Sequence, residues 1–310
     1  MISLRDADAS QVGPPVRDAV RGLDGHPLVV SLSDVHGYLG AARSALKTVG
    51  DHSEYAPVVA TDEAGRLHWD GGEKYVLVFN GDLIDRGPNN EGVIEMVERL
   101  GGEAPRGHVR VTLGNHEWGV LLPGLVHWAE WYSGSCTDAD RRRLCGAIAD
   151  GDVVAAYEGY NFTYAHAGQP IRYDPSVLND RLASAARELA AAAGTDEDAT
   201  VQRRLVDEHQ RLLGTGRQGG RGPGAGIVWL DFRYLPGESP PQVVGHTRQK
   251  QPVQKGNVVC ENVIRANQTN PGGEAVLVES PDRLVSLERT YDGGVHTNEF
   301  RMPDEGSAGR

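Results

Sequence analysis

Five short clusters of polar residues carry the side chains from which chemistry can be expected. Each combines imidazole, carboxylate or amide groups with glycine, and each follows a run of apolar residues. The clusters are Asp34-Val35-His36-Gly37, Gly81-Asp82-Leu83-Ile84-Asp85-Arg86-Gly87, Gly114-Asn115-His116-Glu117, His166-Ala167-Gly168 and Gly245-His246-Thr247. Mixed His, Asp and Asn ligands favour divalent ions such as Mn²⁺, Fe²⁺, Zn²⁺, Co²⁺ or Ni²⁺. Together the clusters predict a metal-dependent site.

Taken singly, each cluster also has a purely structural explanation. An Asp beside Gly can form a turn or cap a helix, and a lone histidine is more often a hydrogen-bonded core residue than a ligand. The joint occurrence favours function, because four of the 11 histidines directly follow predicted strands. Two ions fit better than one, since the two carboxylate oxygens of Asp82 can bridge a pair of ions about 3.5–4 Å apart.

The apolar runs that precede the clusters predict strands. Their β-branched, continuously apolar character is typical of strands covered on both faces. These runs are Leu28 to Leu32, Tyr75 to Phe79, Val109 to Leu113, Phe162 to Ala165 and Gln242 to Val244. Helical patterns follow at Leu39 to Val49, Asn90 to Leu100 and Leu125 to Tyr132, and further strands are expected at Val258 to Cys260, Glu274 to Val278 and Leu284 to Leu287. This alternation predicts an α/β fold, in which loops at the carboxyl ends of strands converge on one crevice.

The stretch from Asp174 to Gly226 differs in character and is interpreted as a helical insertion. Its first helix is expected to begin near Asn179 and end at Gly194, and its second to run from Asp198 to Gly214. The tract from Gly214 to Gly226 is too rich in glycine to hold regular structure, so we expect a flexible arm that borders the crevice. The whole chain, 1–310, is expected to form one domain with a disordered tail from about Pro303.

Composition excludes several classes of partner. A formal net charge of −12 argues against binding to duplex nucleic acid, which needs clustered Lys and Arg. No apolar run is long enough to cross a bilayer, and residues 1–24 lack the order of a signal peptide, so a cytoplasmic protein without a membrane partner is expected. The three cysteines have neither disulfide nor zinc-finger spacing. The acid excess, with only four lysines, is similar to the protein style of a high-salt archaeon.

The five clusters, in this order, resemble the calcineurin-like metallophosphoesterase superfamily. The motifs GDLIDRG and GNHE are similar to its phosphoprotein phosphatase branch, which also includes bacterial diadenosine tetraphosphatases, and the match extends from Asp34 to Thr247. The resemblance implies a four-layer α/β/β/α sandwich, with two mixed sheets face to face and two metal ions at one edge. Mn²⁺ is the first expectation for both ions.

The resemblance also implies a role for each site residue. Asp34 and His36 would bind the first ion, and Asp82 would bridge. Asn115, His166 and His246 would bind the second, with Asn115 also at the substrate. The catalytic residues would be His116 as general acid, Asp85 to orient it and Arg86 to hold phosphate oxygens.

Two departures from the branch and one open position remain. Leu113 precedes GNHE where the eukaryotic enzymes have Arg, and the fourth cluster reads HAG rather than HGG. The branch has a second phosphate-binding arginine between the last two histidine clusters. Arg233 is the first candidate, with Arg217 and Arg221 as rivals, and a surface ion pair with Asp231 explains Arg233 equally well.

The expected function is hydrolysis of phosphomonoesters by a metal-bridging hydroxide. A Ser/Thr phosphoprotein is the first substrate expected, and a diadenosine polyphosphate or another nucleotide is the second. An aromatic group could stack a nucleobase or belong to the core; its members are Trp118, Trp128, Trp131 and Tyr132. A catalytically silent metal-binding scaffold is the alternative from another class, and the presence of Asp85, Arg86 and His116 argues against it.

Overall fold

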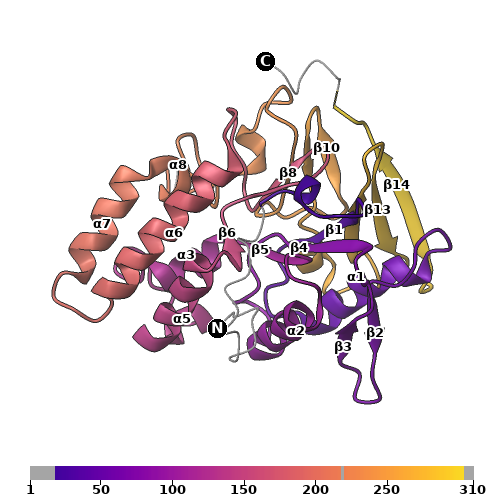
Figure 1. Ribbon diagram of the computed structural model, residues 1–310, viewed down its shortest axis with the longest axis horizontal. Helices are drawn as coiled ribbons and strands as arrows, with labels where there is room; N and C mark the ends of the chain where they lie inside the picture. Colours follow the sequence, from indigo (N-terminus) through magenta and orange to yellow (C-terminus); the bar gives the residue numbers. More distant parts are fainter. Residues whose placement is uncertain (1–17, 218–219, 304–310) are drawn as a thin grey trace.

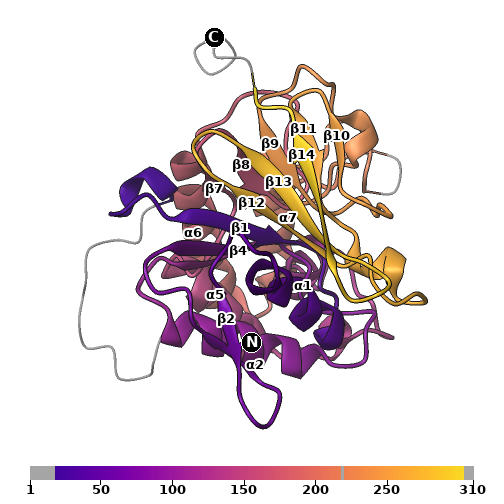
Figure 2. The ribbon, with the colours of Figure 1, turned by 90° about the vertical axis from the view of Figure 1, so that its right-hand side faces the viewer.

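The computed structural model describes residues 18–217 and 220–303, and two β-sheets stacked on each other dominate it (Figures 1 and 2). The larger sheet has the order β14-β13-β12-β1-β4-β5-β6, and the smaller has the order β10-β11-β9-β8-β7. The larger comprises β1 (Leu28–Leu32), β4 (Tyr75–Phe79), β5 (Val109–Thr112), β6 (Val153–Val154), β12 (Ala275–Glu279), β13 (Leu284–Arg289) and β14 (Val295–Phe300). The smaller comprises β7 (Tyr157–Glu158), β8 (Thr163–Ala165), β9 (Gln242–Val244), β10 (Val253–Lys255) and β11 (Val258–Cys260). A separate ribbon pairs β2 (Val59–Thr61) with β3 (Leu67–Trp69).

Both sheets are mixed, as the family resemblance implied. In the larger, β1, β4, β5 and β6 run parallel, whereas β12 pairs antiparallel with β1. In the smaller, β8, β9 and β11 run parallel. Parallel strands end at a common edge, so each sheet presents the loops after several strands on one side.

The strands are apolar throughout because both faces of each are covered. Val29 and Val78 of the larger sheet meet Tyr164, Val243 and Val259 of the smaller in a core between the sheets. The alternate residues of β1 and β4 point to the opposite face and pack in a second core beneath helices.

Helices cover the outer face of the larger sheet. The predicted helices are confirmed as α1 (Leu39–Asp51) and α2 (Asn90–Glu103), which lie beneath the strands in Figure 2. The prediction of a helix from Leu125 to Tyr132 is wrong: residues 125–131 are irregular, and α3 (Asn115–Leu121) precedes them. Pro123 and Gly124 directly after α3 explain why the helix stops there. The helices α4 (Tyr132–Ser135) and α5 (Asp138–Ala149) follow.

The segment after β8 forms α6 (Pro175–Ala192), α7 (Asp198–Glu208) and α8 (Gln210–Leu213). α6 and α7, with α5, form the flank at the left of Figure 1. The first of them begins earlier than predicted, because Asp174 accepts a hydrogen bond from Ser176 N and Pro175 occupies the first helical position. Asn179 lies inside that helix, where its Oδ1 accepts from Ala155 N at 2.8 Å.

Short 3₁₀ turns complete the described chain. They are η1 (Val20–Gly22), η2 (Phe232–Tyr234) and η3 (Ile264–Asn267). The predicted disordered tail falls on residues 304–310, outside the part that the structure describes. Within that part, no helix combines the length and apolar character needed to cross a membrane.

Candidate metal centre

The five sequence clusters meet at one edge of the two sheets. Hydrogen bonds join them directly: Asp34 N donates to Gly81 O at 3.0 Å, and Gly245 N donates to His166 O at 2.8 Å. All six residues expected to bind metal are buried, with at most 4% of their surface exposed. They are Asp34, His36, Asp82, Asn115, His166 and His246.

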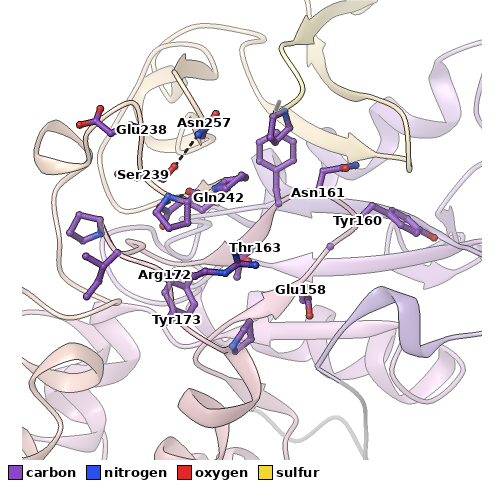
Figure 3. A pocket seen from close by; sticks show the side chains of 18 of the residues that line it. Glu158, Tyr160, Asn161, Thr163, Arg172, Tyr173, Glu238, Ser239, Gln242 and Asn257 are labelled. Atoms are coloured by element: carbon purple, nitrogen blue, oxygen red, sulfur yellow. Dashed lines mark hydrogen bonds between the residues drawn. The ribbon is translucent and has the colours of Figure 1, made fainter. Parts of the chain in front are cut away.

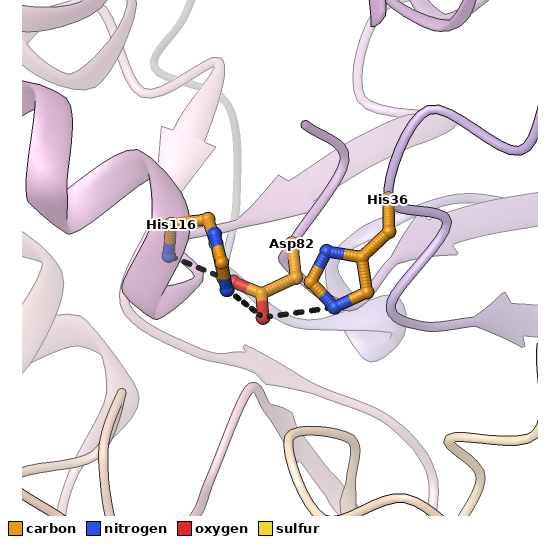
Figure 4. A group of neighbouring side chains, drawn as sticks. All are labelled: His36, Asp82 and His116. Atoms are coloured by element: carbon orange, nitrogen blue, oxygen red, sulfur yellow. Dashed lines mark hydrogen bonds and ion pairs between the residues drawn. The ribbon is translucent and has the colours of Figure 1, made fainter. Parts of the chain in front are cut away.

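Asp82 lies at the middle of this group. Its Oδ2 is 3.6 Å from His36 Nε2 (Figure 4). The same oxygen is 3.3 Å from His166 Nε2. Two sets of potential ligand atoms share it: one with His36 and His116, the other with His166 and His246, and within each set all atoms lie within 4.8 Å. One carboxylate between two ligand sets is the arrangement that a pair of bridged ions requires.

The remaining candidate ligands, Asp34 and Asn115, lie on opposite sides of this group. Asp34 Oδ1 is 3.6 Å from His36 Nε2. On the other side, Asn115 Oδ1 is 3.2 Å from His166 Nε2 and 2.8 Å from His246 Nδ1.

Hydrogen bonds fix which ring nitrogen two of the candidate ligands, His36 and His166, turn toward the centre. Nδ1 of His36 lies 3.0 Å from Ile84 O, and Nδ1 of His166 lies 3.0 Å from Asn80 O. A carbonyl only accepts, so each Nδ1 donates and each Nε2 faces the centre, where it would bind an ion through its lone pair after losing any proton. Asp34 Oδ1 is buried without a hydrogen-bond partner. Imidazole nitrogens and a free carboxylate oxygen of this kind are donors that divalent ions bind.

The charges of these groups also act on one another's pKa. Burial alone lowers the pKa of His166, but the nearby carboxylates of Asp82 and Asp34 outweigh it and raise that pKa to about 9. Burial alone raises the pKa of Asp82, yet His166 and His116 hold it well below its usual range. The Asp82 carboxylate is therefore charged and draws positive charge toward itself.

The backbone at this edge is strained. Six residues with side chains have left-handed φ here: Asp34 (52°), His36 (48°), Asp82 (54°), Asp85 (73°), Arg86 (67°) and His246 (55°). Among the other non-glycine residues that the structure describes, only His26 has a left-handed φ. Such conformations cost free energy and cluster at functional sites.

His116, at the start of α3, contacts both other residues expected to be catalytic. Its Nδ1 is 2.5 Å from Asp85 Oδ2, and its Nε2 is 3.0 Å from an Arg86 Nη. Arginine only donates, so Nε2 accepts and the ring is neutral with its proton on Nδ1. Burial lowers the pKa of His116 by more than Asp82 and Asp85 raise it, so the neutral imidazole is favoured here. Ser133 donates to Asp85 through both N and Oγ at 2.7 Å.

The chain matches the family model described as calcineurin-like phosphoesterase over residues 28–198. It belongs to the calcineurin-like phosphoesterase family. The expected family, fold class and enzyme class, a hydrolase acting on phosphate esters, are thereby confirmed at the level of the family.

Relatives of this phosphoesterase carry phosphatase names. It is 30% identical over 133 residues to Shewanella-like protein phosphatase 2 of Arabidopsis thaliana, which is 39% of this chain and 30% of the plant protein. The match thus spans less than a third of that protein's length. The comparisons give no support to an archaeal origin.

Solved structures show the same fold. A cold-active protein-tyrosine phosphatase of a Shewanella species has a TM-score of 0.56 and 22% identity, over 91% of this chain and 82% of that one. A single-substitution mutant of a cold-active protein tyrosine phosphatase gives a TM-score of 0.57 at 21% identity, over 94% and 84% of the two chains. At these identities the likeness concerns the fold alone.

The aromatic group of the phosphoesterase divides into two parts. Trp118 is fully buried and belongs to the core. The Arg86 guanidinium carbon lies over Trp131, 4.8 Å from the centroid of the Trp131 ring. Trp128 stacks on His116, with 5.0 Å between the two ring centroids. Trp229, which the sequence did not single out, lies 6.2 Å from the His246 ring.

The candidate phosphate-binding arginines are placed differently. The side chain of Arg233 is 70% exposed, and its Nε is 3.1 Å from Asp231 Oδ1, as in the surface ion pair considered above. The pKa of His246 is lowered first by burial and then by the charges of His166 and Arg221. Arg221, in the glycine-rich arm, therefore lies close to His246. Its charge and that of Arg265 also contribute, after burial, to a lowered pKa of Arg86. Arg217 is exposed. Arg265, on the turn after β11, was missed because no motif surrounds it.

Other supporting residues also escaped sequence reasoning. Ser133 gives no signal, because it lies 48 positions from Asp85 in an unremarkable stretch. Asn80 could have been noticed, since it directly precedes the second cluster. Glu117 was part of a quoted motif but received no role.

A cavity of about 440 Å³ lies away from this centre (Figure 3). Thr163 and Gln242, the first residues of β8 and β9, help to line it, together with Tyr160, Arg172 and Tyr173. It is therefore at the amino ends of the strands whose carboxyl ends carry His166 and His246.

Proposed function

We propose that this phosphoesterase hydrolyses phosphomonoesters with two divalent ions, and that a phosphoprotein is its substrate. The observation that carries the proposal is the single Asp82 carboxylate shared by two buried sets of potential ligand atoms. The two ions, when bound, would activate the attacking water and stabilise charge on the phosphoryl oxygens. The proposed ligands are Asp34, His36, Asp82, Asn115, His166 and His246. Mn²⁺ as the preferred ion and a cytoplasmic location belong to this proposal.

Arg86 binds the phosphate in this proposal. Its guanidinium is held between Trp131 and His116, and its buried Nε has no hydrogen-bond partner among the described residues. An arginine with free donors suits phosphate oxygens. Arg221 is the better-placed second arginine, because its charge reaches the centre whereas Arg233 is paired with Asp231.

His116 protonates the leaving oxygen. In the present geometry its Nε2 accepts from Arg86. A phosphate that draws Arg86 away frees Nε2, and the negative charge of the phosphate favours its protonation. Asp85, itself held by Ser133, keeps the ring oriented through Nδ1. An acid at this position avoids the expulsion of a strongly basic alkoxide.

The nature of the alcohol is the finer part of the proposal. The printed names of the relatives are those of a protein phosphatase and of a protein-tyrosine phosphatase, which supports a phosphoprotein. Ser/Thr esters stay first because the motifs GDLIDRG and GNHE resemble the phosphoprotein phosphatase branch. Nucleotides such as diadenosine polyphosphates are the second candidate, because the Trp128 and Trp131 rings beside His116 and Arg86 could stack a base.

One experiment tests the proposal and separates its rivals. The purified protein is assayed with phosphoserine, phosphothreonine and phosphotyrosine peptides, diadenosine polyphosphates and cyclic nucleotides, with Mn²⁺ and with excess chelator. We expect Mn²⁺-dependent release of phosphate from phosphopeptides. Full activity in excess chelator would contradict the metal mechanism, and metal binding without any turnover would support the silent scaffold instead.

A further inference from the structure

Glu117 is a fully buried carboxylate that binds backbone rather than side chains. Its Oε2 accepts from Asp82 N at 2.9 Å and Gly114 N at 3.2 Å, and its Oε1 accepts from Leu83 N at 2.9 Å and Ile84 N at 3.4 Å. All four hydrogen bonds recorded for it in the described chain come from main-chain amides. A buried charge is tolerated when it is hydrogen-bonded in this way.

The four donors belong to two of the motif turns. Gly114 begins the turn after β5, and the other three lie in the turn after β4. That second turn holds Asp82, Asp85 and Arg86 in left-handed conformations. Strained backbone persists only where its surroundings fix it, and Glu117 supplies three of the contacts that do so.

The two turns also press together. A Cβ added at Gly114 would overlap the backbone N of Asp82 and the Glu117 carboxylate, so these groups are in close contact. The side chain of Asp82 also contacts α3, because its Oδ1 accepts from His116 N at 2.9 Å. Asp82 is thus held at its amide by Glu117 and at its carboxylate by the start of α3.

Helix capping alone does not account for Glu117. A glutamate at the third position of α3 that accepts from Gly114 N forms half of a capping box, and this is a purely local role. Capping predicts no bond to the amides of Asp82 and Leu83, which lie 35 and 34 positions away.

We propose that Glu117 is the positioning residue of the metal centre. By holding the turn from Asp82 to Arg86, it sets Asp82 between the two ions and directs Arg86 toward the phosphate. This inference rests on the proposed function in so far as Asp82 is taken to be a metal ligand. Loss of a residue that orients a metal ligand typically lowers metal affinity or activity by ~10–100-fold.

The chain offers a matched control in Glu279. This glutamate is equally buried and accepts from Asn161 N at 2.6 Å, Phe162 N at 3.1 Å and Tyr164 OH at 2.8 Å. Its partners lie near the amino end of β8, away from the metal centre. Glu117→Gln and Glu279→Gln therefore make the same chemical change, since an amide NH₂ cannot accept from N–H donors.

The test titrates Mn²⁺ into metal-free wild type, Glu117→Gln and Glu279→Gln by calorimetry, with thermal melting to show that each is folded. We expect Glu117→Gln to weaken Mn²⁺ binding by ~10–100-fold and Glu279→Gln to leave it unchanged. Wild-type affinity in Glu117→Gln, or equal weakening in both variants, overturns the proposal.

A second variant covers the case in which Glu117→Gln does not fold. Glu117→Asp keeps the charge but is one methylene shorter, so it cannot reach both turns. We expect weaker Mn²⁺ binding together with faster hydrogen exchange at the amides of residues 82–84, and wild-type values for both overturn the proposal. If the wild type hydrolyses no phosphoester while the Glu117 variants lose Mn²⁺ affinity, the proposed function fails and the positioning role stands.

Discussion

The two ends of β8 and β9 differ in almost every physical respect. At their carboxyl ends, His166 and His246 are buried, and the neighbouring ligands have strained backbone. At their amino ends, Thr163 and Gln242 line an open cavity, and none of the described residues around that cavity has a positive φ. The same two strands thus support a closed, highly charged centre at one end and a relaxed surface cavity at the other.

The largest open space near these strands and the residues that could do chemistry therefore lie in different places. A large cavity is a common first guess for an active site, yet here the cavity contains none of the motif residues. The motif residues instead occupy the region where strain and buried charge are concentrated, two features that lower stability and persist where function requires them. Substitutions at the two ends should therefore have opposite balances of activity and stability.

The largest expected effect is that of Asp82→Asn. It removes the carboxylate shared by both ligand sets, so we expect loss of at least one ion and a fall in turnover of ~10³–10⁴-fold or more. Metal content by elemental analysis and phosphate release measure it. Glu158→Gln, at the rim of the cavity, is the control with full activity. Retention of two ions by Asp82→Asn would break the comparison.

His116→Asn should have the next largest effect. The loss of a general acid lowers turnover by ~10²–10⁴-fold on an alkyl phosphate and by much less on an activated aryl phosphate, which needs little protonation. The metal content should remain at the wild-type value, because His116 is proposed as an acid and not as a ligand. Loss of a metal ion, or equal slowing of both substrates, would assign His116 a different role.

A smaller effect distinguishes the two arginines. Arg221→Ala should raise KM by ~10-fold, as expected for a lost hydrogen bond to a charged group. Arg233→Ala should leave kcat and KM nearly unchanged, because an exposed ion pair contributes little. Steady-state kinetics with one phosphopeptide suffices, and the reverse ranking would restore Arg233 as the phosphate ligand.

The sequence predicted the centre better than its surroundings, for a physical reason. Strands such as β1 and β4, and the clusters after them, are local patterns that can be recognised in a few residues. Ser133 and Arg265 reach the site only through tertiary packing, and nothing local marks them. The start of α6 was misplaced because Asn179 resembles a cap, whereas the Asp174-Pro175 pair is the stronger helix start. The missed helix α3 is only seven residues long and lies directly in the third motif.

The smallest effect on activity is expected from Glu279, whose influence is on stability alone. Burial raises the pKa of Glu279 to about 7 from 4.5. Because the folded-state pKa is above the unfolded one, its contribution to stability is fully present below pH 4.5 and is lost as the pH rises through about 7. A pKa raised from 4.5 to about 7 corresponds to about 3 kcal/mol at most. The difference in free energy of unfolding between Glu279→Gln and wild type should therefore move in favour of the variant from pH 5 to pH 8, as urea unfolding at both pH values would measure. Phosphatase activity should stay at the wild-type level. A difference that does not change with pH would mean that Glu279 keeps its ordinary pKa, and the cavity end of the strands would then carry no electrostatic cost at all.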